Sequence, residues 1–195
     1  RQMCIRDSLY MDPIKDLTAE HDAVRLTLRI LEKINTDIDR SGKIAAGDHI
    51  DTLLEFLRVF VDKCHHGKEE KLLFPALEEV GVGKEGGPIG VMLDEHRQGR
   101  ELVGTMTAAM TQYRQGEAAA AARFSEAAKA YIDLLNRHIE KENNVLFSIA
   151  GRHLSIDTLS ELKKGFDRIE TEEIGTGRHD EFHRMLHNLE KVYLQ

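Results

Sequence analysis

Long stretches of this chain place apolar residues alternately three and four positions apart, and Gly-rich stretches interrupt this pattern. The stripe that runs from Ile14 to Leu31 has spacings of 3, 4, 3, 4 and 3 residues. Such spacing is typical of a helix that buries one face, and no segment alternates as a β-strand would. We therefore predict an all-α fold, an up-down-up-down four-helix bundle with an additional C-terminal helical segment. The expected breaks are 41–47, 81–88, 115–117, 151–157 and 174–177.

The breaks divide the chain into three parts. Residues 1–10 lack the long apolar core of a signal peptide and fit nothing that follows, so we expect a non-native or disordered leader. Residues 11–152 are expected to form the bundle, and residues 153–195 a helical extension that packs on it. A chain of 195 residues is long enough to bury a hydrophobic core without disulfides.

The composition excludes several classes of partner. The chain has 27 basic and 34 acidic residues, a net charge of −7, and no basic block, so we expect no nucleic-acid partner. No apolar run approaches the roughly 20 residues that span a bilayer, so we expect no membrane partner either. Two cysteines, Cys4 and Cys64, are too few for a disulfide framework. They fit a reducing compartment, and we expect a cytoplasmic protein.

Six polar residues lie on the apolar stripes that should face the core. They are His21, His65, Glu69, His96, His138 and Glu142. An ionised carboxylate in an apolar interior is costly unless it is paired or binds a metal. Residues four apart share one helix face, so each His-x-x-x-Glu offers a nitrogen and an oxygen toward one point. The pattern predicts a buried metal pair, with two iron ions favoured over manganese or zinc.

The same pattern occurs twice. His65, Glu69 and Phe74 recur 73 residues later, and Glu20-His21 recurs 75 residues later as Glu95-His96. Amphipathic helices share leucines by chance, but that does not explain shared His and Glu within the stripes. We interpret the first two helices as a duplicate of the next two.

Three motifs together resemble the hemerythrin-like, HHE cation-binding family: HHGKEEKLLFP, DEHRQGRELV and RHIEKENNVLF. The resemblance covers about residues 13–149 and implies a non-haem di-iron centre in a four-helix bundle. Glu69 and Glu142 match its bridging carboxylates, which act together with a solvent-derived bridge. The residues that match its terminal nitrogen ligands are His21, His65, His96 and His138.

One position departs from the oxygen-carrying hemerythrins, which have a further His one turn after the His of the third helix. Here that residue is Arg100, which stays protonated and cannot bind a metal. One iron is therefore expected to lack a protein ligand, which weakens the inference to reversible O₂ carriage. As a hypothesis, His179, His183 or Glu173 of the C-terminal segment supplies an extra ligand or a gate.

Two neighbours of the motif remain open to interpretation. His66 and Glu70 are also four residues apart, but the repeat selects His65 and Glu69. We expect His66 and Glu70 to lie on a flanking face or to hydrogen-bond the ligands. Cys64 is interpreted as a small core residue, with redox sensing as the alternative.

The resemblance implies binding of a small ligand or oxidant, O₂, NO or peroxide, for sensing, storage or detoxification. No general acid is evident, so we expect a metal- and ligand-binding protein more than a dedicated enzyme. The alternative is a di-iron redox enzyme that reduces peroxide or NO or oxidises ferrous iron. A third hypothesis is a structural bundle without metal, in which removal of the buried polar groups would stabilise the fold.

Overall fold

The computed structural model describes residues 12–195, and all regular structure in this range is helical, which confirms the predicted all-α class. The predicted leader, residues 1–10, lies outside the described residues. Within 12–195, no helix combines the length and apolar character needed to cross a membrane.

Four rods form the bundle, and each ends at a break expected from the sequence. The first rod, α1 (Pro13–Ser41), starts where the Asp12 side chain accepts a hydrogen bond from the Ile14 N–H, and it stops at Gly42 with φ of 67°. Both ends follow common capping rules. The second rod comprises α2 (Gly47–Phe56), η1 (Leu57–His66), η2 (Glu69–Leu73) and α3 (Phe74–Glu79). The third and fourth rods are α4 (Pro88–Arg114) and the succession α5 (Ala120–Lys141), η3 (Glu142–Leu146) and α6 (Phe147–His153).

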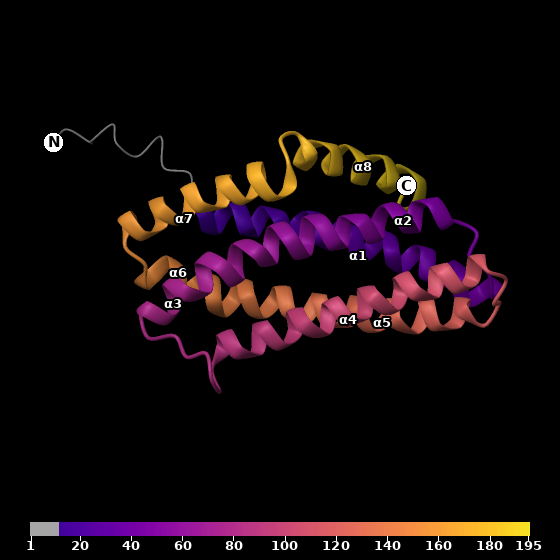
Figure 1. Cartoon of the computed structure of the whole chain (residues 1–195), viewed down its shortest axis with the longest axis horizontal. Helices are drawn as coiled ribbons and strands as arrows, with labels where there is room; N and C mark the ends of the chain where they lie inside the picture. Colours follow the sequence, from indigo (N-terminus) through magenta and orange to yellow (C-terminus); the bar gives the residue numbers. More distant parts are fainter. Residues whose placement is uncertain (1–11) are drawn as a thin grey trace.

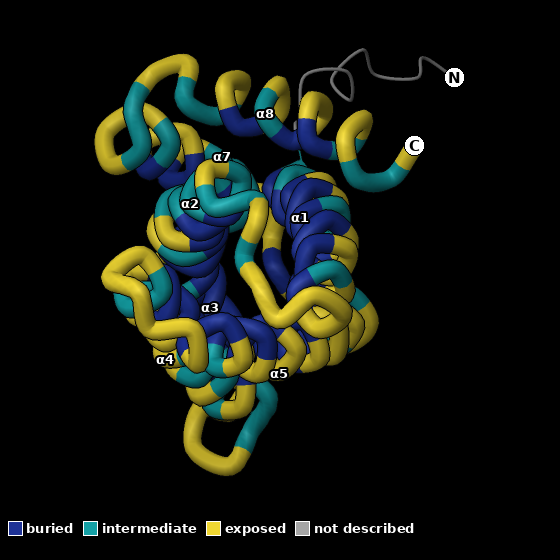
Figure 2. The backbone as a smooth tube through the Cα atoms, turned by 90° about the vertical axis from the view of Figure 1, so that its right-hand side faces the viewer, coloured by how far each residue is buried: buried dark blue, intermediate teal, exposed yellow. Residues whose placement is uncertain are grey.

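The C-terminal extension packs along one side of the bundle. It comprises α7 (Ile156–Arg168), η4 (Ile169–Ile174) and α8 (Arg178–Tyr193). Figures 1 and 2 show α7 and α8 on the outer side of α1 and α2, away from α4 and α5. Phe182, Leu186 and Leu189 of α8 join the bundle core.

Segments of π-helix interrupt two of the rods. The segments η1 and η2 carry the first His-x-x-x-Glu motif, and η3 begins at the glutamate of the second motif. A π turn holds more residues than an α turn, so successive side chains are rotated by less around the rod. Such turns are frequent at functional sites. The sequence pattern did not predict them, because its interpretation assumed α-helical spacing.

The apolar core forms two clusters with the polar residues between them. One cluster contains Val24, Phe60 and Phe124. The other contains Leu17, Leu73 and further residues near the opposite end of the rods. Along each rod the buried His and Glu residues lie at the boundary between these two clusters. The fold therefore encloses a polar zone within a long apolar core.

We expect Phe182→Ala to lower the free energy of unfolding by about 3–5 kcal/mol, the usual cost of removing a buried Phe. The Phe182 ring is buried and contacts the rings of Phe56 and Phe60 edge-on. Val192→Ala in the same helix is the control, because Val192 is 60% exposed and should change stability by less than about 0.5 kcal/mol. Urea unfolding measures both. Equal stability of the two variants would show that α8 does not unfold with the bundle.

Candidate metal centre

Two carboxylates lie at the middle of the bundle without a hydrogen-bond partner. Glu69 and Glu142 are both 0% exposed, and none of their four oxygens has such a partner within residues 12–195. Burial, and next the charge of Glu142, raises the pKa of Glu69 well above its usual value. Burial also opposes ionisation of Glu142, but His138, His21 and His96 together outweigh it and hold the pKa of Glu142 below its usual value. Unpaired buried carboxylates are costly, so this arrangement requires compensation.

Four imidazoles surround the two carboxylates. A Glu69 oxygen lies 3.5 Å from the Nε2 of His65, and its other oxygen lies 3.5 Å from the Nε2 of His96. One Glu142 oxygen lies 3.2 Å from the Nε2 of His21 and 3.3 Å from the Nε2 of His138. The histidines also form two close pairs, because the Nε2 atoms of His21 and His65 are 3.0 Å apart and those of His96 and His138 are 3.2 Å apart. Each carboxylate therefore contacts both pairs.

The outer nitrogen of each imidazole contacts an oxygen acceptor. Nδ1 of His65 lies 2.7 Å from Glu20, and Nδ1 of His138 lies 3.0 Å from Glu95. The other two contacts are Nδ1 of His96 with Glu70 at 2.7 Å and Nδ1 of His21 with Asn143 at 2.9 Å. A neutral imidazole has one N–H, so donation from Nδ1 leaves a lone pair on each Nε2. Facing lone pairs repel unless a cation lies between them, and this orientation is typical of metal-binding histidines.

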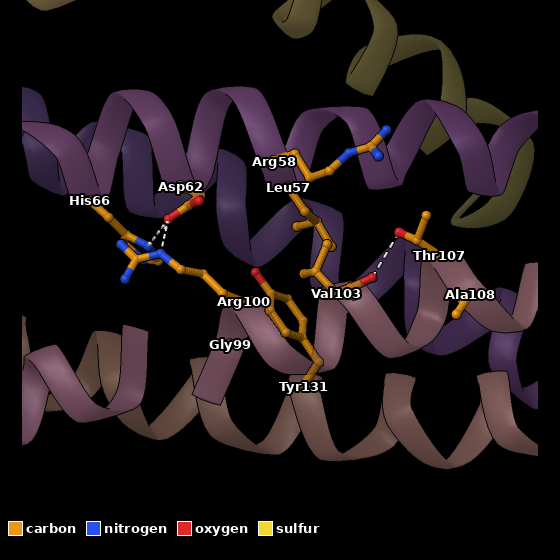
Figure 3. Close-up of a pocket in the computed structure, with 11 residues that line it drawn as sticks. Leu57, Arg58, Asp62, His66, Gly99, Arg100, Val103, Thr107, Ala108 and Tyr131 are labelled. Carbon is orange, nitrogen blue, oxygen red and sulfur yellow. Dashed lines mark hydrogen bonds and ion pairs between the residues drawn. The ribbon is translucent and has the colours of Figure 1, made fainter. Parts of the chain in front are cut away.

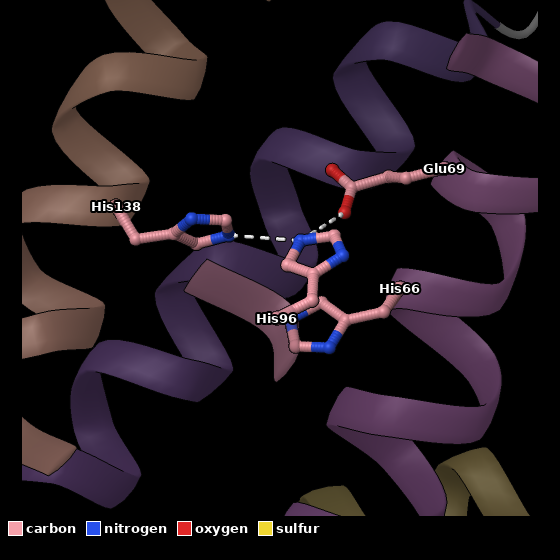
Figure 4. A group of neighbouring side chains, drawn as sticks. All are labelled: His66, Glu69, His96 and His138. Carbon is pink, nitrogen blue, oxygen red and sulfur yellow. Dashed lines mark hydrogen bonds and ion pairs between the residues drawn. The ribbon is translucent and has the colours of Figure 1, made fainter. Parts of the chain in front are cut away.

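The donors form two groups that share Glu69. In each group the ligand atoms lie within 4.8 Å of one another. One group is His66, Glu69, His96 and His138 (Figure 4), and the other is His21, His65, Glu69 and Glu142. All six residues singled out in the sequence are thus buried and brought together. Lone-pair nitrogens and unpartnered carboxylate oxygens are a donor set that fits two cations such as iron.

His66 belongs to the first group, although the sequence placed it beside the site. It is buried, and neither ring nitrogen has a hydrogen-bond partner within the described chain. Its ring stacks on His96 at 3.8 Å between centroids, and the nearest carboxylate oxygen, of Asp62, is 3.6 Å from Nδ1. The position 73 residues later is Ile139, so His66 is a donor without a counterpart in the second half. That difference between the repeats is the sequence signal that could have identified it.

Arg100 occupies the position of the further His of the oxygen-carrying hemerythrins, and it lies outside the first donor group. Its Nε donates to Asp62 at 2.6 Å, and its terminal nitrogen donates to Glu70 at 2.5 Å. Glu70 in turn accepts from His96, so Arg100 supports the orientation of that imidazole.

The structure places His179 and His183 outside both donor groups. Their rings lie beside the ring of Phe60, at 5.1 and 6.1 Å between centroids. They line a separate cavity of about 230 Å³ together with Glu20, the residue that hydrogen-bonds His65. The two histidines are therefore close to the partner of a candidate ligand and not among the ligands.

In each half of the repeat, a lysine pairs with the glutamate that contacts a candidate ligand histidine. The ammonium group of Lys68 lies 2.5 Å from Glu20 and also pairs with Glu170 of η4, whereas Lys141 pairs with Glu95. Lys68 is fully buried beneath the extension, but the side chain of Lys141 is 40% exposed. Cys64 lies close to Glu20 and Glu170, the two carboxylates that pair with Lys68, and burial raises the pKa of its thiol to about 12. Because the ammonium group of Lys68 already pairs with both carboxylates, they require no metal.

Several known proteins are similar to this chain over part of its length. The iron–sulfur cluster repair protein DnrN of Neisseria gonorrhoeae is 34% identical over 87 residues, 43% of this chain and 55% of that protein. The repair protein YtfE of Edwardsiella ictaluri is 34% identical over 117 residues, 55% of this chain and 49% of that protein. An uncharacterized protein of Mycobacterium bovis is 27% identical over 137 residues, 68% of this chain and 51% of that protein.

The chain spans about half the length of these curated relatives. No solved structure matches it significantly. Residues 12–150, which include both donor groups, match the hemerythrin HHE cation-binding domain. The chain therefore belongs to the hemerythrin-like family of cation-binding domains.

Proposed function

We propose that this protein holds two non-haem iron ions and binds O₂, NO or peroxide at them, for sensing, storage or detoxification. The observation that carries the proposal is the pair of fully buried carboxylates, which have no hydrogen-bond partner in the described part of the chain and lie next to the Nε2 atoms of four imidazoles. Manganese and zinc are less favoured occupants of the same donors. A reducing, cytoplasmic compartment is the expected location and would keep the iron available.

The donor groups divide between two positions. We propose that His96, His138 and His66 hold one ion and that His21 and His65 hold the other, with Glu69 and Glu142 bridging them. Bound ferrous iron would supply electrons and an open coordination position for the oxidant. On this assignment His66 takes the role that Arg100 cannot fill. The position with two imidazoles is then the one left open.

Aromatic rings shield part of the site from water. The ring of Phe147 stacks on His21 at 5.3 Å, and the ring of Phe74 lies 5.8 Å from that of His96. These phenylalanines correspond in the repeat and belong to one apolar cluster. Removal of water strengthens the electrostatic interactions within the site. Within residues 12–195, the nearby carboxylates of Glu20, Glu70 and Glu95 contact the outer imidazole nitrogens and orient the ligands, so binding is favoured over dedicated catalysis.

A second function is suggested by the names of two relatives. Both are iron–sulfur cluster repair proteins, and they match different lengths of this chain. If this protein repairs such clusters, its iron centre would act as that of a redox enzyme, the class that reduces peroxide or NO or oxidises ferrous iron.

An iron–sulfur enzyme inactivated by NO provides the test of this second function. Repair predicts that the activity of that enzyme returns only when the iron-loaded protein is added.

We expect the purified protein to contain two irons per chain and to lose stability when a chelator removes them. A cation bound at a concentration 100 times its dissociation constant stabilises the folded state by about 2.7 kcal/mol. Elemental analysis and thermal unfolding, with and without chelator, measure both effects. A Glu69→Gln, Glu142→Gln double variant should bind little iron and not respond to the chelator. If that variant were instead more stable than the untreated protein, the bundle would be structural and metal-free.

We expect His66→Leu to remove about half of the iron, because it deletes the third imidazole at one position only. His183→Leu and His179→Leu are the matched controls and should retain two irons and an unchanged optical spectrum. The alternative assignment, in which the C-terminal segment completes the site, predicts the opposite pattern. Iron content and the spectrum of each oxidised variant decide between them.

We expect the reduced protein to bind NO with a distinct optical change, because one position keeps a vacant coordination site. Mixing with O₂ then separates the candidate roles. A spectrum that reverses on removal of O₂ supports storage, and rapid oxidation supports sensing or turnover. A reduced protein whose spectrum responds to none of NO, O₂ and peroxide would contradict the proposed ligand binding.

A further inference from the structure

A cavity of about 510 Å³ lies between η1 and α4, beside the first donor group (Figure 3). His66 of that group is part of its wall, and Tyr131 of α5 lies at its base. Other lining residues are exposed, Arg58 and Gly104 among them, so the cavity opens at the surface. It therefore connects solvent with the edge of the candidate metal centre.

The cavity is much larger than O₂, NO or peroxide requires. A water molecule occupies about 30 Å³ of liquid, whereas pockets of about 300–1,000 Å³ take organic molecules. The space exists because α4 presents small residues here: Gly99, Gly104 and Ala108. A Cβ added at Gly104 would meet no atom within 4 Å. The small residues thus maintain an opening that most side chains would narrow.

The lining is apolar on its sides and polar near the metal centre. Leu57, Val103 and the Tyr131 ring supply apolar surface. The Tyr131 hydroxyl has no hydrogen-bond partner in the described chain, and burial raises its pKa, so it remains a donor. Both nitrogens of His66 are likewise without a hydrogen-bond partner. Arg100 adds a positive charge at this end of the cavity, although Asp62 and Glu70 pair with it.

A second positive charge lies at the rim. Arg58 lines the cavity and forms no ion pair with any described residue. The lining thus contains two arginines and one acidic residue, Asp62, together with an unpartnered phenol donor. This charge and donor pattern complements an anionic acceptor group better than a cationic one.

We propose that this cavity is a second ligand site, which binds a medium-chain monocarboxylate with its apolar chain between Leu57 and Val103 and its carboxylate toward Tyr131 and Arg100. The cavity, its unpartnered donors and its charges carry this inference, and it does not depend on the presence of iron. A ligand in this position would lie against His66 and so beside the candidate metal centre. The inference therefore extends the proposed function from diatomic ligands to an organic molecule.

Calorimetric titration of the purified protein with octanoate tests the proposal. We expect saturable binding of one octanoate per chain and at least tenfold weaker binding of octylamine, which has the same chain and the opposite charge. Gly104→Leu should weaken octanoate binding at least tenfold, because its side chain enters the cavity. Gly151→Leu is the matched control, since Gly151 is also an exposed helical glycine with nothing within 4 Å of its added Cβ. It should bind octanoate as the unmodified protein does.

Two further variants keep the test decisive. Ala108→Leu fills the cavity from the next turn of α4 and replaces Gly104→Leu if that variant does not fold. Tyr131→Phe should weaken octanoate binding about tenfold or more, the usual loss for one hydrogen bond to a charged group. Equal binding by the filled and control variants, equal binding of octylamine, or no binding of octanoate would each overturn the proposal.

Iron content, measured in every variant, separates this inference from the proposed function. Gly104→Leu and Gly151→Leu should both retain two irons. Octanoate binding that persists after chelation supports the cavity site, and binding that disappears with the iron shows a carboxylate bound to metal and overturns it. Absence of iron together with retained octanoate binding would contradict the proposed function alone.

Discussion

The arrangement of the bundle interior depends on two carboxylates that are removed from water and have no hydrogen-bond partner among residues 12–195. Burial of Glu69 and Glu142 is costly, and the protein compensates by placing imidazoles on every side of them. Those imidazoles are in turn held by outer acceptors such as Glu20 and Glu95. Apolar clusters on both sides of this zone fix the rods that carry the donors. Cations at the centre would convert the repulsion between the donors into attraction.

The duplicated sequence produces a nearly symmetric centre, and its departures from symmetry are informative. His66 has Ile139 as its counterpart, so one donor group has three imidazoles and the other has two. Lys68 is enclosed by Glu170 of the extension, whereas Lys141 remains partly exposed. The extension therefore covers only one half of the site. The cavity lined by His66 lies beside the other donor group, so the two donor groups have different surroundings.

Family membership and local geometry support different parts of the functional conclusion. The match over residues 12–150 establishes a hemerythrin-like cation-binding domain, and the donor chemistry of the buried groups favours iron. Two relatives that match about half of their own length to this chain are named for iron–sulfur cluster repair. A fold hosts several activities, so the surroundings of the site decide among them. Here those surroundings include an apolar cavity next to the candidate centre.

The sequence by itself determined the helical class, the breaks between rods and six buried donors, because spacing along one helix follows from backbone geometry. His66 could not be placed in this way. Adjacent residues of an α-helix are about 100° apart, and only the π-helical backbone of η1 and η2, together with packing against His96, brings its ring inward. The positions of Arg100 and His183 were likewise decided by tertiary structure. Which groups meet across helices depends on how side chains pack between rods, and linear spacing does not contain that information.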